Sequence, residues 1–263
     1  MERQNKKESV ATFHKESILA AAEKLFLNKG VASTTIDDIA GASDYSKRTI
    51  YAYYINKDDI LYHIILKGLA RLKQDLAEAL RGDDDSPSGD GLPTSDGMPV
   101  SDDLPAGDGL PASDSLPVSD GLPAGDGSIS SDDFLARYFA ICAAIEKYQT
   151  NSPQSAESVN QARTGALDMA ALPPVAARIF GIGAEINEML ADFISRGKRR
   201  GIVRADVEPM MTVYMMWGGI TSLLSLVASK GVFIEKELSV SRAGFLEYGY
   251  KQIINSILEE RIK

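Results

Sequence analysis

The chain has 263 residues, with 28 Lys and Arg against 37 Asp and Glu, which gives a formal net charge of −9. The acidity is local: residues 83–127 hold eleven Asp and no basic residue, and the remainder carries 28 basic against 26 acidic residues. The net charge therefore does not exclude nucleic acid as a partner. Cys142 is the only cysteine, which excludes an intrachain disulfide, and we expect no metal and no cofactor, because neither histidine has ligand partners at metal-binding spacing.

The N-terminal residues predict two helices joined by a tight loop. Apolar residues recur on one helical face from Ile18 to Phe26, and Gly30 is placed to end that helix. The start of the chain, with Arg3, Lys6 and Lys7, is expected to form a disordered tail, although contacts of these basic residues with a nucleic acid stay open. Thr35, with Asp38 three residues later, is typical of a capping box and predicts the start of a second, short helix.

A third helix and a long fourth helix follow. Residues 41–44 read as a turn, after which Ser46 is placed to cap a helix that carries Lys47, Arg48, Thr49 and Tyr51 near its outer face. The fourth helix, over residues 57–82, has a continuous apolar stripe. A helix, a short turn and a basic helix are typical of a helix-turn-helix DNA-binding unit, although an ordinary helical hairpin with a solvated face has the same periodicity.

The residues themselves resemble a known family. The pattern Ile-Leu-x-x-Ala-x-x-Leu-Phe-x-x-x-Gly from Ile18 is followed by Thr-Thr-Ile-x-x-Ile-Ala from Thr34 and by Ser-Lys-Arg-Thr-Ile-Tyr-x-Tyr-Tyr-x-x-Lys-x-x-Ile-Leu from Ser46. Together these motifs are similar to the DNA-binding domain of the tetracycline-repressor (TetR) family. Asp44 stands where the family usually has Gly, and Tyr45 where it has a small aliphatic residue.

The resemblance implies an all-α fold and a role for each matching position. Thr35, Tyr51 and Lys57 are expected to hold the phosphate backbone of double-stranded DNA, and Lys47, Arg48, Thr49 and Tyr53 to enter the major groove. Ser46, at the N-terminus of the same helix, completes the predicted DNA-binding set. The DNA-binding domain would then span residues 1–56, and residues 57–82 would connect it to the rest of the chain.

The acidic segment at residues 83–127 repeats every six residues as Asp-Gly-Leu-Pro-x-Ser/Gly. A parallel β-helix also repeats in sixes, but the proline in each copy has no N–H to donate to a strand. One Leu or Met per repeat is also too little apolar surface to offset the entropy of ordering. The sequence therefore predicts a disordered linker, and a role as a docking strip for a partner stays open.

Residues 128–263 again read as helices and are expected to form a ligand-binding and dimerisation domain. Residues 209–229 carry no charge, and a helix of that length would reach about 30 Å, enough to cross a bilayer. A membrane-anchored regulator is therefore one alternative. The family resemblance instead implies that two late helices of each subunit build a homodimer interface. We expect that interface to contain Gly218, Gly219, Leu223, Phe245, Tyr250, Ile253 and Ile257.

The expected function is a DNA-binding transcriptional regulator rather than an enzyme. The resemblance implies a cytoplasmic homodimer, usually a repressor, that binds a palindromic operator without membrane association and is released by an unknown small-molecule effector. A second alternative is a helical adaptor that binds its partner through the acidic repeat. Aromatic residues, methionines and one cysteine suit an adaptable apolar pocket, although core packing explains them equally well. They are Tyr138, Cys142, Phe180, Met211, Met215 and Trp217.

Overall fold

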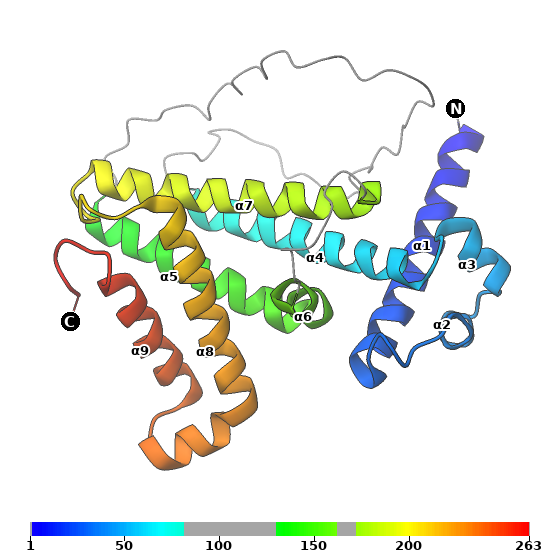
Figure 1. Cartoon of the computed structure of the whole chain (residues 1–263). Coiled ribbons are helices and arrows are strands. Elements are labelled where there is room, and N and C mark those ends of the chain that lie inside the picture. Colours follow the sequence, from blue (N-terminus) through cyan, green and yellow to red (C-terminus); the bar gives the residue numbers. More distant parts are fainter. Residues whose placement is uncertain (1, 82–129, 162–171, 263) are drawn as a thin grey trace. The chain divides into compact units, whose positions relative to one another are not determined.

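The computed structural model describes residues 2–81, 130–161 and 172–262 (Figure 1). Within these ranges the chain is all-α, as predicted, and the predicted linker at 83–127 lies outside them. The helices are α1 (Glu2–Lys29), α2 (Ile36–Ser43), α3 (Lys47–Tyr53), α4 (Lys57–Leu80), α5 (Ser131–Asn151), α6 (Pro153–Gln161), α7 (Pro174–Arg199), α8 (Pro209–Leu238) and α9 (Arg242–Asn255).

The first three helices and the start of α4 enclose a core of their own. Ile18, Phe26, Ile39, Ile50 and Ile60 are at most 2% exposed in this cluster, so one apolar residue or more from each helix holds the unit together. The prediction of an unstructured tail was wrong, because α1 begins at Glu2. The segment 2–17 has no Gly or Pro and contains three Glu and three Lys, so helix propensity extends α1 although this segment has no apolar stripe.

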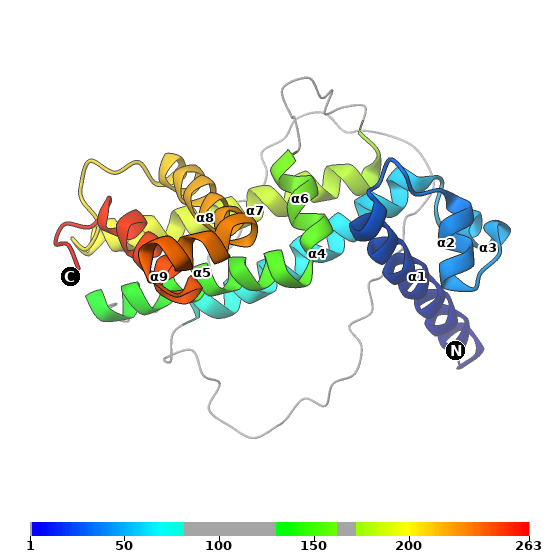
Figure 2. The same ribbon diagram turned by 90° about the horizontal axis from the view of Figure 1, so that it is seen from below.

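A second and larger core lies between α4, α5, α7, α8 and α9. Figures 1 and 2 show α4 running alongside both α5 and α7, which are its main packing partners. Phe134 of α5 stacks on Phe193 of α7 with ring centroids 4.4 Å apart, and both side chains are buried. Gly197 makes room for this stack, since a Cβ there would lie 2.5 Å from Cε2 of Phe134.

The end of α4 is tied to the second turn of α5. Nη1 of Arg137 donates a hydrogen bond to the backbone oxygen of Leu80 at 2.7 Å, and that oxygen has no partner further along its own helix. One turn earlier on α4, the buried carboxylate of Asp75 accepts from Nζ of Lys147 at 2.9 Å. The hydrogen bonds of Arg137 and Lys147 therefore add to the apolar packing of α4 on α5.

Helix α6 is held against α4 by Ser155. Its buried hydroxyl lies 2.8 Å from the Tyr148 hydroxyl and donates to the backbone oxygen of Ile65 at 3.2 Å. Gly68 faces the same serine so closely that a Cβ there would come within 2.4 Å of Oγ. Because α6 also contacts α1, it touches both the N-terminal helical unit and α4, the helix that leads out of it.

The C-terminal end differs from the expectation that Ile257 lies on a late helix. Helix α9 stops at Asn255, because Leu258 forms an isolated antiparallel bridge with Val203. The backbone N–H of Arg204 donates to Ile257 at 3.0 Å, and that of Glu259 donates to Ile202 at 2.9 Å. These bonds fasten the end of the chain to the connection between α7 and α8.

Candidate nucleic-acid interface

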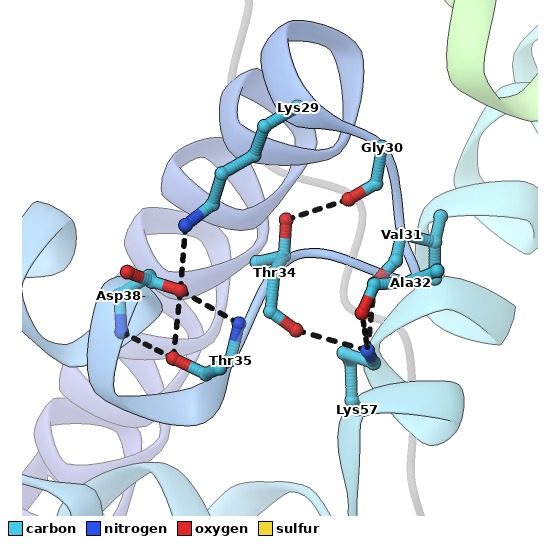
Figure 3. Close-up of polar contacts among 8 residues, drawn as sticks. All are labelled: Lys29, Gly30, Val31, Ala32, Thr34, Thr35, Asp38 and Lys57. Atoms are coloured by element: carbon cyan, nitrogen blue, oxygen red, sulfur yellow. Dashed lines mark hydrogen bonds and ion pairs between the residues drawn. The ribbon is translucent and has the colours of Figure 1, made fainter.

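The N-terminus of α2 is fixed by the predicted capping box (Figure 3). Oγ1 of Thr35 accepts from the Asp38 backbone N–H at 3.2 Å, while the Asp38 carboxylate accepts from the Thr35 N–H and hydroxyl at 2.8 and 2.7 Å. Nζ of Lys29 lies 2.6 Å from the same carboxylate. The Lys29 hydrogen bond, followed by those of Thr35, holds the pKa of Asp38 well below its usual range. Thr35 thus orients α2, and its phosphate contact stays a prediction.

Lys57 ties the loop between α1 and α2 to the start of α4. Its ammonium donates to the backbone oxygens of Val31, Ala32 and Thr34 at 2.6, 3.3 and 2.9 Å, so three carbonyls surround one cation (Figure 3). An ammonium group has three N–H donors, and all three are engaged here. Lys57 therefore holds the loop in this structure, and its predicted contact with DNA would require it to give up one of these bonds.

The short helix α3 presents its basic residues to solvent. Ser46 caps it by accepting from the Thr49 N–H at 3.1 Å, and the two hydroxyl groups lie 2.9 Å apart. Lys47, Arg48 and Tyr51 are exposed, with 55% of Tyr51 accessible, whereas Ile50 points into the core. The turn before α3 holds Asp44 in the left-handed region at φ 59°, a conformation that Asp tolerates. Five of the eight predicted DNA-binding residues therefore lie at the N-terminus of α3 or on its outer side. They are Ser46, Lys47, Arg48, Thr49 and Tyr51.

Tyr53 lies on a different side of α3. It is half-buried, and its Oη is 3.1 Å from Nδ1 of His14 on α1. The sequence analysis did not identify His14, because no spacing rule relates residues 39 positions apart. Whether Tyr53 also reaches the groove stays a prediction.

Lys47 is paired with an acidic residue of α2 that was also missed. Its Nζ lies 2.5 Å from Oδ1 of Asp37, and this hydrogen bond raises the pKa of Lys47. Both side chains are mostly exposed, at 56% and 67%, so the pair is easily exchanged for a phosphate. If Lys47 contacts DNA as predicted, Asp37 competes with DNA for its ammonium group.

Replacing Asp37 by Asn is expected to raise nonspecific affinity for duplex DNA by about two- to fivefold at low salt, because Lys47 becomes free to neutralise a phosphate. The measurement is a fluorescence-anisotropy titration over a salt series. Asp132→Asn, in the first turn of α5, makes the same change in net charge and serves as the control. Equal gains for the two variants would mean that overall charge, and not the pair with Lys47, is responsible.

The six predicted pocket residues do not all lie together. Tyr138 and Cys142 are buried on α5, where burial raises the pKa of the Cys142 thiol to about 12. Trp217 is half-buried and donates from Nε1 to Oδ1 of Asn187 at 3.2 Å. Met211 and Met215 instead are 68% and 70% exposed. The remaining residue, Phe180, is half-buried on α7, and a ligand contact for any of the six stays a prediction.

The predicted interface residues are largely occupied by contacts within one chain. A Cβ at Gly219 would lie 2.9 Å from Cδ1 of Ile253, so this pair belongs to the packing of α8 on α9. Leu223 likewise packs on Gly249, while Tyr250 and Ile257 are 6% and 7% exposed and Phe245 is half-buried. Gly218 alone of the seven is exposed, with open space beside it.

The exposed face of α8 forms an uninterrupted line along the helix, which we call the outer stripe. Its residues recur every three or four positions, with large apolar side chains at the two ends and Gly or Ser between them. They are Met211, Met215, Gly218, Ser222, Ser225, Ser229 and Phe233. Among the described residues, α8 is also the helix whose length and composition would allow it to cross a membrane. One third of its most apolar stretch is buried against the rest of the chain.

A three-helix unit that fixes α3 through caps and a buried core, and leaves its basic face in solvent, defines a helix-turn-helix protein. Residues 18–64 match the family model for bacterial regulatory proteins of the tetR family. The match covers most of the three-helix unit and the start of α4, so this part of the chain is similar to the DNA-binding domain of that family.

Two curated relatives share part of the sequence. The transcriptional repressor BepR of Brucella suis biovar 1 (strain 1330) is 37% identical over 87 residues, which cover 32% of this chain and 40% of BepR. The uncharacterised regulator YvaF of Bacillus subtilis (strain 168) is 42% identical over 57 residues, covering 22% of this chain and 30% of YvaF. The alignments thus span less than half the length of either relative.

The likeness of the fold extends further. The regulator FadR of Bacillus subtilis, solved in complex with stearoyl-CoA, superposes with a TM-score of 0.56 at 11% identity, over 92% of this chain and 98% of FadR. The likeness to FadR is thus one of fold over nearly the whole chain, while the sequence likeness to BepR and YvaF covers 32% and 22% of it.

Proposed function

We propose that this protein is a sequence-specific transcriptional regulator that acts as a ligand-released repressor. The observation that carries the proposal is the exposed face of α3, where Lys47, Arg48 and Tyr51 are presented by a helix whose opposite side is locked into a core. Lys and Arg can neutralise phosphates or bond to guanine, and a phenol can donate to a phosphate oxygen. Binding to DNA also places the protein in the cytoplasm.

The outer stripe of α8 supports a homodimer. Ser222 lies midway between Met211 and Phe233, so two copies related by a two-fold axis at Ser222 would cross where the side chains are small. The large side chains at one end of each stripe would then cover those at the other end of its partner. Burial between two subunits also explains why an unusually apolar helix keeps an exposed face, without a membrane.

A homodimer implies the form of the operator. Two α3 helices that enter successive major grooves must be separated by roughly 34 Å, one turn of the duplex. Both subunits then read the same half-site, so the operator is an approximate palindrome. A ligand that changes the separation of the two helices would release the protein.

The contacts of α6 support this form of control. Ser155 joins Tyr148 of α5 to the backbone of α4, and α6 also touches α1. A ligand bound among the C-terminal helices that moves α6 would therefore move α4, which carries the DNA-binding unit. Such a ligand must bind the released form more tightly than the DNA-bound form. FadR accommodates an acyl-CoA in the same fold, but 11% identity does not transfer that ligand to this chain.

The proposal is tested by gel shift with DNA from upstream of the gene, at stated salt concentrations. Wild-type protein should retard one sequence in preference to others. Tyr51→Phe should weaken binding to all sequences and flatten the salt dependence, because a phosphate contact is lost, whereas Arg48→Ala should change preference at one base position by about 1–3 kcal/mol. Arg178→Ala, on the exposed side of α7, is the control. If no sequence is retarded in preference to others at low salt, the alternative of a helical adaptor that binds a partner through the acidic repeat would be favoured.

A further inference from the structure

Helix α3 has only seven residues, so its orientation depends on what holds its two ends. The buried side of α3 contributes Ile50, and Tyr54 follows as its C-cap. Apolar contact is non-directional: it fixes how deeply a short helix sits but only weakly resists rotation about the helix axis. Hydrogen bonds and ring contacts are directional and resist that rotation.

The imidazole of His14 makes such directional contacts at both ends of α3. Its Nδ1 lies 3.1 Å from Oη of Tyr53, the last residue of the helix. Its ring centroid lies 4.9 Å from that of Tyr45, which stands in the turn just before the helix. On the next residue of α1, the backbone oxygen of Lys15 accepts a hydrogen bond from the Tyr54 hydroxyl at 3.2 Å. His14 and Lys15, on one turn of α1, thus contact residues at both the start and the end of α3.

We infer that His14 is a positioning residue for sequence recognition, and that the Tyr53 hydroxyl acts through His14 rather than by contacting bases. This inference rests on the proposed function of α3 as the DNA-reading helix. A base contact tolerates only a small error of position and angle, whereas attraction to phosphates changes little when a helix rotates by a few degrees. Loss of the His14 contacts should therefore weaken specific binding much more than nonspecific binding.

The beginning of α1, which lacks an apolar stripe, has a structural role at α3. His14 lies four residues ahead of Ile18, the first fully buried residue of the α1 stripe. Only a helix that continues beyond the stripe brings His14 alongside Tyr45 and Tyr53. The extension of α1 therefore has a role at α3 that hydrophobic periodicity does not reveal.

The test measures operator and nonspecific affinities for His14→Ala, Tyr53→Phe and the double variant. We expect His14→Ala to lower the ratio of specific to nonspecific affinity about tenfold, with an unchanged salt slope, and the double variant to match the single ones. Additive effects would show that Tyr53 contacts DNA independently, and an unchanged ratio for His14→Ala would also overturn the inference. Val10→Ala, an exposed position one turn earlier on α1, is the control.

Hydrogen exchange of the free protein separates failure of this inference from failure of the proposed function. The amides of Ile50 and Tyr54, which donate within α3, should exchange faster in His14→Ala than in wild type, while those of α7 are unchanged. Unchanged exchange in α3 would overturn the positioning role whether or not DNA binds. If wild-type protein binds no operator but exchange in α3 responds to His14, the proposed function is wrong and the positioning contact stands.

Discussion

Replacing Phe134 by Ala is expected to lower the free energy of unfolding by about 3–5 kcal/mol, because a fully buried aromatic ring is lost and its site cannot collapse. The ring stacks on Phe193 with an interplanar angle of 7° and lies against Gly197, so it joins α5 to α7, the two helices that also pack on α4. Urea unfolding followed by circular dichroism, at one fixed protein concentration, measures the change.

Two further variants test this interpretation of the core. Leu27→Ala, at a position 45% exposed on α1, should cost less than about 1 kcal/mol. Gly197→Ala should cost about 1–3 kcal/mol, because its new methyl group would meet Phe134 at 2.5 Å and Val203 at 2.8 Å. A loss below about 1 kcal/mol for Phe134→Ala would show that the contact between α5 and α7 is not tightly packed.

Replacing Met215 by Glu is expected to dissociate the proposed homodimer. Met215 is 70% exposed in one subunit, so a glutamate there leaves the fold of each subunit intact. In a two-fold interface along the outer stripe, the same change buries two carboxylates without partners, which should weaken dimerisation at least about 100-fold. Operator affinity should fall with it, because each monomer reads only one half-site.

Sedimentation equilibrium and gel shift on the same samples measure both effects. Ala136→Glu, on the exposed side of α5, introduces the same charge on a different surface and should leave the dimer unchanged. If Met215→Glu and Ala136→Glu sediment alike as dimers, the outer stripe does not form the interface.

The local features of the DNA-binding unit could be predicted from the sequence because their spacing is local. Thr35 with Asp38 and Ser46 before α3 are helix caps, in which a side chain bonds a backbone group three residues away. The apolar stripe of α4 follows the same short-range logic. Such patterns need no knowledge of the tertiary fold.

The contacts that give these residues their roles join distant parts of the chain. Lys57 bonds carbonyls 23 to 26 residues away, and His14 meets Tyr53 across 39 residues. A family resemblance assigned Lys57 to phosphate, but it could not show that three carbonyls already occupy its ammonium. Contacts of this kind depend on how the helices pack, which residue spacing does not encode.

The C-terminal helices show a different limit of sequence reasoning. Helix α8 is apolar nearly all round, so its periodicity predicts a helix without indicating which side faces its own chain. Gly218 and Gly219 are adjacent and chemically identical, yet only Gly219 packs against Ile253. The predicted interface therefore included several residues that serve the packing of α8 on α9.

The bond from Arg137 to Leu80 joins the last turn of α4 to the second turn of α5, so it links the two sides of the gap between Arg81 and Ser130 in the described chain. Leu72 and Leu76, before this junction, share one core with Phe134 and Ile141, after it. The two portions are thus held together by packing as well as by their covalent connection. Cleavage between them would leave a two-chain protein, in which one piece carries α3 and the other the outer stripe of α8. If α3 reads DNA and α8 forms the dimer interface as proposed, these two activities would then lie on separate polypeptides that associate through the shared core.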